Sequence, residues 1–364
     1  MQARQANGIA VSGAATRIAS IEDDETRSRR PWAYVQNYLL GAPDLMHGRL
    51  GTDMICTDRK QDPARAATRG DPFAGGTAVV TGAASGIGEQ LSVQLARRAS
   101  NLALIDRKAE ELAAVAARLR AEHPQLRITH HVVDLADRDQ VARVGEDVLA
   151  EHDTVTVLLN NAGVGLAGRL DQVSAEETDW LLQINLHAPI ALVRAFLPAM
   201  HSGARVVLVS SIFGIIAPPG QTAYCTAKFG LRGFGMSLRH ELACRGIGVT
   251  VVYPGGVRTR IADDARVGAG VSEAEDEIGR TLLDKGLRMD PADAARIILR
   301  GVQRGRARVL VGASAVALDL LERAVPTGGG AVLSALYERA VSRHVRAAAN
   351  QARTAQHQGA AGRP

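Results

Sequence analysis

The sequence predicts an α/β fold in which about seven parallel strands form one doubly wound sheet with helices on both faces. Three observations predict it. Short runs rich in Val, Ile and Leu alternate with segments of helical periodicity from residue 77 onward. These runs are apolar throughout, which is typical of parallel strands buried on both faces. Finally, 364 residues, of which 46% are hydrophobic and 22% charged, can fill a large core.

Each expected strand is a β-branched run between turn residues. The strands lie near 77–81, 102–106, 127–133, 154–159, 205–209, 248–253 and 307–311. The segments between them place apolar residues three and four apart, as a helix that packs one face on a sheet requires. These helices are expected at 86–98, 108–122, 137–150, 175–200, 222–244 and 291–304. Residues 260–290 are polar, and we expect them to form a lid over the substrate.

Extensions are expected on both sides of a single catalytic domain of residues 75–312. Residues 1–74 are rich in Arg, Asp and Gly and show little periodicity. We therefore expect a poorly ordered N-terminal extension that the chemistry does not need. Residues 313–364 are expected to form a helical C-terminal extension and a disordered tail.

The C-terminal extension begins with an amphipathic stretch at residues 316–325. Its apolar members are Leu318, Leu320, Leu321 and Val325, and they are set against Asp319, Glu322 and Arg323. We interpret the stretch as a helix that packs on the domain or on a partner subunit. A cover over the substrate cleft and a membrane-surface helix are the alternatives. A glycine-rich break then precedes a second short helix, expected at 331–347.

Composition and charge argue against several classes of protein. The net charge of +5 comes largely from the tail, where residues 338–364 hold five Arg against one Glu. Such scattered Arg side chains are typical of a solvated tail, so no nucleic-acid partner is expected. No stretch of 18 apolar residues occurs and the N-terminus lacks the apolar core of a secretory signal, so no transmembrane segment is expected. Three cysteines without metal spacing fit a cytoplasmic protein with reduced thiols and no metal site.

Tyr224 and Lys228 form the most informative pair in the chain. A spacing of four residues on a helix puts the phenol and the ammonium on one face, one turn apart. An ammonium beside a phenol favours the phenolate and lowers its pKa, so that Tyr224 could act as a general acid or base near neutral pH. Ser211, thirteen positions upstream, could hold the oxygen of a reacting alcohol or carbonyl.

A glycine-rich turn lies far upstream of this pair, between the first strand and the first helix. It reads Gly82-Ala83-Ala84-Ser85-Gly86-Ile87-Gly88, with the glycines in the pattern Gly-x-x-x-Gly-x-Gly. Glycines at such a turn let the backbone approach a pyrophosphate, which rests on the helix N-terminus. The strand before the turn and the helix after it supply the context that a dinucleotide site needs.

Together these residues resemble the short-chain dehydrogenase/reductase family, in its single-domain branch. Further matches follow in the family's order: Asp106, Asp134 with Leu135, Asn160-Asn161-Ala162-Gly163, Asn185, Ser210 with Ser211, and Pro254-Gly255-Gly256-Val257-Arg258-Thr259. The resemblance covers roughly residues 74–312 and implies a Rossmann-type fold. It also implies a homodimer or homotetramer through the helices expected at 175–200 and 222–244. In the second of these helices, the apolar residues exceed what one sheet-facing stripe requires, so a second face is expected to contact a partner.

The cofactor expected from these residues is NAD. Asp106 ends the second strand, where its carboxylate can accept hydrogen bonds from both hydroxyls of a ribose and would repel a 2′-phosphate. Arg107 could pair with that phosphate, so NADP stays an alternative. The resemblance implies further cofactor contacts from Asp134, Leu135, Asn161, Ala162, Gly163, Pro254, Gly255, Val257 and Thr259, in addition to Gly82, Ser85, Gly86, Ile87, Gly88, Tyr224 and Lys228.

The resemblance also assigns the catalytic roles. Tyr224 exchanges the proton of the substrate hydroxyl, and Lys228 lowers the pKa of Tyr224 and binds the nicotinamide ribose. Ser211 holds the substrate oxygen, and Asn185 keeps a proton relay in place. The expected substrate is a moderately lipophilic secondary alcohol or ketone, because residues 212–216 could present an apolar wall.

Two other functions compete with this interpretation. A 3-oxoacyl thioester reductase would use NADPH and the same four residues. A non-catalytic dinucleotide-sensing module would be expected to lack at least one of Asn185, Ser211, Tyr224 and Lys228, and all four are present.

Overall fold

The computed structural model describes residues 71–326, together with Ala335 and Arg339. The expected N-terminal extension therefore lies outside the described residues up to residue 70, as do the tail and nearly all of the expected second C-terminal helix. Near the start of this range, Phe73 is fully buried in the core and lies beneath the guanidinium of Arg98.

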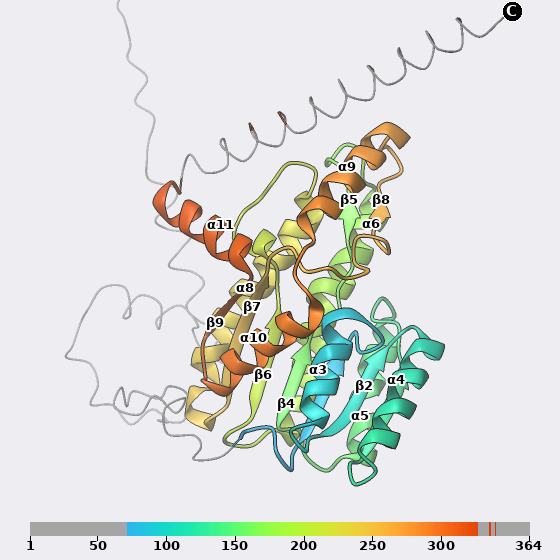
Figure 1. The fold of residues 1–364 in the computed structure, drawn as a ribbon, viewed down its shortest axis with the longest axis vertical. Coiled ribbons are helices and arrows are strands. Elements are labelled where there is room, and N and C mark those ends of the chain that lie inside the picture. Colours follow the sequence, from blue (N-terminus) through green and yellow to red (C-terminus); the bar gives the residue numbers. More distant parts are fainter. Residues whose placement is uncertain (1–70, 327–334, 336–338, 340–364) are drawn as a thin grey trace, which may run out of the picture. The chain divides into compact units, whose positions relative to one another are not determined.

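Seven parallel strands form the central sheet (Figure 1). They are β1 (Thr77–Thr81), β2 (Asn101–Asp106), β3 (Ile128–Val132), β4 (Val157–Asn160), β6 (Arg205–Val209), β7 (Gly248–Pro254) and β9 (Arg308–Val311). Their order across the sheet is β3-β2-β1-β4-β6-β7-β9. The chain thus winds in one direction from β1 to β3 and in the other from β4 to β9, and the predicted doubly wound sheet is confirmed.

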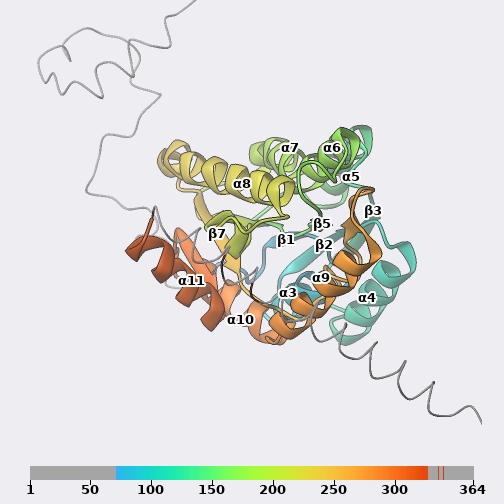
Figure 2. The same ribbon diagram turned by 90° about the horizontal axis from the view of Figure 1, so that it is seen from above.

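Helices cover both faces of this sheet (Figure 2). One face packs against α3 (Gly86–Ala96), α4 (Ala109–Glu122) and α10 (Pro291–Gln303). The other face packs against α5 (Arg138–Glu151), α6 (Ala175–Leu182), α7 (Ala188–Phe196) and α8 (Thr222–Glu241). Because the strands alternate their side chains between these two apolar layers, they are buried along most of their length, as the continuous apolar runs predicted.

Side-chain caps fix the starts of several helices. The Asp137 carboxylate accepts backbone N–H bonds at the start of α5, and Asp290 does the same for α10. Ser174 and Glu177 form a reciprocal capping box at the start of α6. These caps satisfy N–H groups that a helix start would otherwise leave without a partner.

The long helix expected at 175–200 is present as Ala175–Ala199, but it is not α-helical throughout. A π-helical turn, Gln183–His187, joins α6 to α7, and a 3₁₀ turn, Leu197–Ala199, ends the helix. The π-helical turn contains Asn185, whose side chain bonds to a neighbouring loop instead of facing solvent. Asn is unfavourable inside a helix, and π-helical turns often occur at functional positions.

This same segment, Ala175–Ala199, has the length and composition of a membrane-spanning helix, and an 18-residue stretch of it has a mean hydropathy of 1.3. Half of that stretch is buried inside the domain, where α7 packs on α5 and β4, and core helices of soluble proteins have the same length and composition. Its apolar character is accounted for by this packing.

The expected lid contains regular structure that the sequence did not predict. Strand β8 (Arg266–Val267) pairs in parallel with β5 (Leu166–Ala167), and helix α9 (Glu273–Gly286) follows. The guanidinium of Arg266 stacks 3.7 Å from the ring centre of Trp180. A two-residue strand is too short to carry a periodic signal, and the pairing of β5 with β8 joins residues about 100 apart in sequence.

Candidate active site

The site lies at the carboxyl ends of the strands, where the winding of the sheet reverses between β1 and β4. Ligands of doubly wound sheets bind in the crevice at this switch point. The glycine-rich turn follows β1, and Asn161, Ala162 and Gly163 follow β4. Residues 82–88 and 161–163, which are far apart in sequence, therefore meet at one edge of the sheet.

The glycines of the first turn are required by the backbone path. Gly82 and Gly86 have φ angles of +68° and +58°, in the left-handed region that disfavours side chains. A Cβ on Gly88 would lie 1.9 Å from the carbonyl oxygen of Gly82, so no larger residue fits there. The turn thus presents bare backbone and the N-terminus of α3 to the crevice, which fits a pyrophosphate.

Thr81 connects the end of β1 with the loop after β4, a role that was not predicted from the sequence. Its Oγ1 accepts N–H bonds from both Asn161 and Ala162, each at 3.0 Å. The Asn161 amide returns a bond of 2.9 Å to the Thr81 carbonyl oxygen. A threonine that ends a buried strand directly before a glycine turn is the signal that could have indicated this role. Asn161 therefore supports the crevice wall.

Asp106 ends β2 beside the same turn. One carboxylate oxygen accepts the N–H of Ala84 at 3.0 Å, and the other accepts the N–H of Lys108 at 3.1 Å. Carboxylate oxygens accept more than one hydrogen bond each, so Asp106 can also receive ribose hydroxyls. The sequence placed Asp106 correctly at the strand end, but its hold on the glycine turn emerges only from the structure.

The opposite wall of the crevice comes from the loop after β7. The N–H of Gly255 donates to Val311 and that of Val257 donates to Gly255, which fixes the turn after Pro254. A Cβ on Gly86 would lie 3.2 Å from Cγ2 of Thr259, so this loop reaches across to the glycine turn.

Two further contacts lie just after β2 and β3. Asp264 of the lid forms a 2.7 Å ion pair with Lys108, just after β2. On the neighbouring strand end, the Asp134 carboxylate accepts the N–H of Ala136 at 2.9 Å, and Leu135 is buried. The role of Asp134 and Leu135 as cofactor contacts stays a prediction.

Tyr224 and Lys228 lie one turn apart near the start of α8, as their spacing predicted. The Lys228 Nζ is 5.6 Å from the centre of the Tyr224 ring and donates to the Val209 carbonyl at 3.2 Å. Lys228 is only 3% exposed. The backbone around it is held by Ser210, whose hydroxyl donates to the Lys228 carbonyl at 2.9 Å.

Asn185 lies directly behind this lysine. It is fully buried, its Oδ1 accepts the Val164 N–H at 2.9 Å, and its amide donates to the Val164 carbonyl at 2.8 Å. A Cβ on Gly163 would lie 3.2 Å from both the Asn185 Oδ1 and the Lys228 Nζ. Glycine at this position therefore leaves the two polar groups facing the same small space.

Ser211 is the fourth candidate catalytic residue, and it follows the end of β6. It precedes a 3₁₀ turn, Ile212–Gly214, and its Oγ accepts the Phe213 N–H at 3.1 Å. The Phe213 ring meets the Tyr224 ring edge-on, with their centres 6.1 Å apart. Ser211 also forms a side-chain hydrogen bond with Tyr224. The structure thus brings Asn185, Ser211, Tyr224 and Lys228 together.

The protonation expected from sequence is not what this structure gives. Burial raises the pKa of Tyr224 to about 12, and its hydrogen bond with Ser211 offsets this only in part. Burial also lowers the pKa of Lys228 to about 8. The pKa of Tyr224 is therefore raised overall and not lowered as expected beside Lys228, because burial disfavours both charged forms.

Of the apolar wall expected from residues 212–216, only Phe213 lies beside Tyr224, and the isoleucines lie elsewhere. Ile212, Ile215 and Ile216 are buried in a cluster with Tyr253 and Ala315, away from solvent. A run of isoleucines has the same sequence signal whether it lines a cleft or fills a core.

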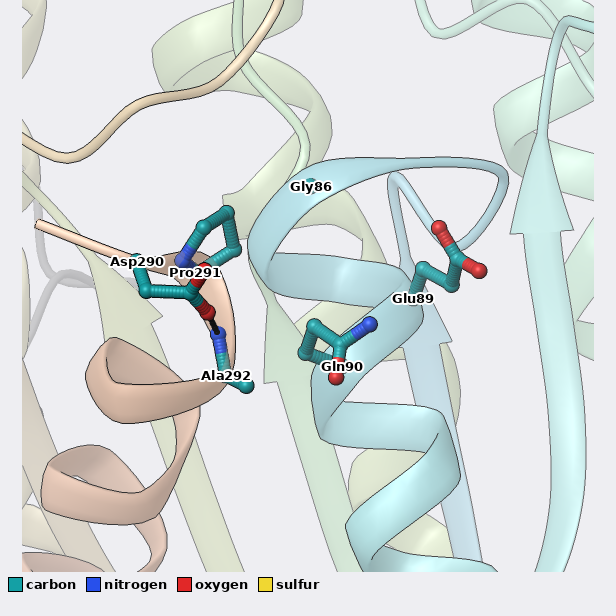
Figure 3. A pocket seen from close by; sticks show the side chains of 6 residues that line it. All are labelled: Gly86, Glu89, Gln90, Asp290, Pro291 and Ala292. Atoms are coloured by element: carbon teal, nitrogen blue, oxygen red, sulfur yellow. Dashed lines mark hydrogen bonds between the residues drawn. The ribbon is translucent and has the colours of Figure 1, made fainter.

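A separate hollow of about 190 Å³ lies between the first turn of α3 and the start of α10 (Figure 3). It is lined by Gly86, Glu89, Gln90, Asp290, Pro291 and Ala292, and the Ala292 N–H donates to the Asp290 carboxylate at 2.8 Å. None of the four candidate catalytic residues borders it, so the hollow lies on the outer flank of the glycine turn.

Comparison with known proteins decides the family. A family model described as short chain dehydrogenase matches residues 76–269. The chain belongs to the short-chain dehydrogenase/reductase family. SadH of Mycobacterium tuberculosis, which is named an oxidoreductase, is 35% identical to it over 275 residues, covering 74% of this chain and 95% of SadH.

Solved structures of the short-chain dehydrogenase/reductase family superimpose on this chain. One from Burkholderia phymatum, in complex with NAD, gives a TM-score of 0.63 at 26% identity and covers 70% of this chain and 95% of its own. One from Sphingobium yanoikuyae, in complex with NADPH, gives 0.55 at 27% identity and covers 69% and 95%. The predicted family, the predicted fold and the assignment as an NAD(P)-dependent oxidoreductase are thereby confirmed.

Proposed function

We propose that this short-chain dehydrogenase/reductase interconverts a secondary alcohol and a ketone, with Tyr224 as the acid–base group. The convergence of Ser211, Tyr224 and Lys228 at the open end of the sheet carries the proposal. A panel of ketones and alcohols, assayed with NAD(H) and NADP(H) by the absorbance of the reduced nicotinamide, tests it. A well-folded chain that turns over no member of the panel would contradict the proposal.

The residues of the crevice fit a nicotinamide dinucleotide. The bare glycine turn accommodates the pyrophosphate, Asp106 offers a carboxylate to a ribose, and the loop after β7 faces the turn. When bound, the nicotinamide ring gives or accepts the hydride. Asp106 supports NAD, which the Burkholderia relative binds, while NADPH in the Sphingobium relative keeps the alternative open.

The chain's own residues then handle the oxygen and the proton. Ser211 donates a hydrogen bond to the substrate oxygen and holds it beside Tyr224. In reduction, the Tyr224 hydroxyl gives its proton to that oxygen, and a pKa of about 12 keeps this hydroxyl protonated at neutral pH. In oxidation the proton moves the opposite way. Lys228 binds the ribose. Asn185 and Lys228 border the space at Gly163, through which Tyr224 regains a proton after it has given one to the substrate.

Two substrate classes are compatible with these four residues. A moderately lipophilic ketone or secondary alcohol stays our proposal, although of residues 212–216, which first suggested it, only Phe213 lies beside Tyr224 and the isoleucines lie in the core. The 3-oxoacyl thioester reductase is the competing activity, and steady-state rates with NADH and NADPH on both substrate classes would separate the two. A cytoplasmic location stays a prediction.

The pH dependence of ketone reduction should reflect the protonation of the Lys228 ammonium. The value of kcat/KM is expected to be level from about pH 6 to about pH 7.5 and to fall above about pH 8, where Lys228 loses its proton while Tyr224 keeps its own. Alcohol oxidation should instead rise with pH, because it needs Tyr224 to accept a proton. Reduction that accelerates between pH 7 and 9 would contradict these assignments.

A homo-oligomer through α8 is also proposed. Among the apolar residues of the helix expected at 222–244, Leu231, Leu238 and Leu242 are buried in the core. Phe229 and Met236, seven residues apart, are 38% and 55% exposed on the outer face. Between them, a Cβ on Gly233 would meet open space, so another helix could approach closely.

Met236→Glu should dissociate this oligomer, because it places a charge in an apolar interface. Light scattering at micromolar concentration should show a dimer or tetramer for the wild-type chain and a monomer for the variant. Val132→Glu, which charges an exposed apolar side chain on the edge strand β3, is the matched control and should leave the mass unchanged. A monomeric wild-type chain would refute the proposal.

A further inference from the structure

Helix α11 (Ala313–Ala324) follows the last strand and lies along the β9 side of the sheet (Figure 1). Its buried Ala315 belongs to the apolar cluster that contains Ile212, Ile215 and Tyr253, and Leu318 packs against this cluster. Ile212 directly follows Ser211, so α11 supports the turn that carries Ser211 from behind.

The start of α11 supports the opposite wall of the crevice. The Gly256 N–H donates to the Ser314 Oγ at 3.4 Å. A Cβ on Gly255 would lie 2.4 Å from that oxygen and 3.0 Å from the backbone nitrogen of Ala315. The turn at residues 254–256, which holds the expected cofactor contacts Pro254 and Gly255, therefore rests against the same helix as the turn of Ser211.

The carboxylate of Asp319 holds the helix in this place, although the sequence predicts Asp319 on the polar face of the helix. Asp319 is only 5% exposed, whereas Leu320, expected on the packing face, is 60% exposed. Both Asp319 oxygens accept from the Arg308 guanidinium on β9, one of them at 3.1 Å. Arg308 also lies 5.1 Å from the centre of the Tyr253 ring, and Arg323 donates to Asp319 at 3.1 Å.

The Asp319 contacts determine which face of α11 turns inward. Burial alone would raise the pKa of Asp319, but the hydrogen bonds and charges of Arg308 and Arg323 lower it overall, so the carboxylate stays ionised. A buried charge that loses its partner is costly, while the pair itself adds little net stability. A rotation of α11 that buried Leu320 instead would leave Arg308 without its carboxylate.

We propose that Asp319, held by Arg308, is a positioning residue for hydride transfer. It fixes α11 against the turn of Ser211 on one side and the turn at residues 254–256 on the other. The distance between the substrate oxygen and the proton donor then depends on this helix. The inference rests on the proposed roles of Ser211 and Tyr224, and Asp319 itself touches neither substrate nor cofactor.

Asp319→Asn tests the inference, because it removes the charge and nearly keeps the shape. With NADH and whichever ketone of a panel (2-octanone, 4-phenyl-2-butanone) the wild-type chain reduces, kcat should fall at least about tenfold, since small displacements of reacting groups cost that much or more. The Kd of NADH should change less than about threefold, because its main contacts lie on the β1 and β2 side. Asp319→Glu, which keeps the charge, should recover part of kcat.

Arg323→Gln is the matched control. Arg323 bonds to the same carboxylate, but it belongs to α11 itself, its side chain is 63% exposed, and it does not tie the helix to the sheet. Its kcat should stay within about twofold of the wild type.

If Asp319→Asn does not fold, Leu318→Ala replaces it in the test. This change loosens the packing of α11 on the cluster beside Ser211 and leaves no charge unpaired. A folded Asp319→Asn or Leu318→Ala variant with a lower Tm but wild-type kcat would overturn the inference. Tyr224→Phe, run in parallel, separates the two proposals. If Tyr224→Phe is active, the proposed catalytic site is wrong. If Tyr224→Phe is inactive and the α11 variants are fully active, only the role of α11 is wrong.

Discussion

Replacing Tyr224 with Phe should lower the turnover of ketone reduction by at least about 10²-fold, the low end for an acid–base group. The variant keeps the ring that packs edge-on against Phe213 and removes only the hydroxyl that bonds to Ser211. The loss corresponds to about 2.7 kcal/mol of transition-state stabilisation. The Kd of NADH, measured by fluorescence titration, should stay within about threefold of the wild type, because the crevice between β1 and β4 is untouched.

Thr226→Ala is the matched control for this variant. Thr226 lies on the same helix, is exposed, and uses its hydroxyl only to bond to the Thr222 carbonyl at 2.9 Å. Turnover of this control should stay within about twofold of the wild type. A Tyr224→Phe protein with near-normal turnover would show that another group moves the proton.

Replacing Asp106 with Ala should shift the cofactor preference toward NADP. The ratio of kcat/KM with NADP to kcat/KM with NAD should rise at least about tenfold, because the change removes a charged hydrogen-bond acceptor for the ribose and a negative charge that faces the 2′-phosphate. The exposed Arg107 would then be free to pair with that phosphate. If the wild-type chain already prefers NADP, Asp106 does not govern the choice.

The structure adds a second effect to this variant. Asp106 also accepts the N–H groups of Ala84 and Lys108, so Asp106→Ala removes one bond from the glycine turn and one from the loop after β2, and it should weaken the binding of both cofactors. Asp106→Asn removes the charge but keeps an acceptor oxygen. Its efficiency with NADP should therefore exceed that of the Ala variant, which separates the charge effect from the support of the turn.

The sequence predicted those parts of the molecule that short-range patterns determine. Strands such as β1 and β6 lie where the apolar runs placed them, because each run is buried on both faces. Tyr224 and Lys228 meet because a helix fixes residues four apart on one face, and Gly82 and Gly86 adopt the positive φ angles that their turn requires.

Long-range contacts decided what the sequence could not predict. Helix α11 is amphipathic in either orientation, and only the pairing of Asp319 with Arg308 on β9 decides that Leu320 faces outward. The isoleucines after Ser211 are buried because α11 covers them. The pKa of Tyr224 depends on burial, which the spacing to Lys228 does not reveal.

Deuterium transfer is the most direct measurement of the central claim, that this chain moves a hydride between a nicotinamide and a carbonyl carbon. The wild-type chain would be incubated with a ketone that it reduces and with each of the two isomers of NADH that carry deuterium at C4. The account predicts that one isomer places one deuterium on the carbinol carbon of the product and that the other places none. An alcohol product without deuterium from either isomer, or cofactor oxidation without any alcohol, would contradict it.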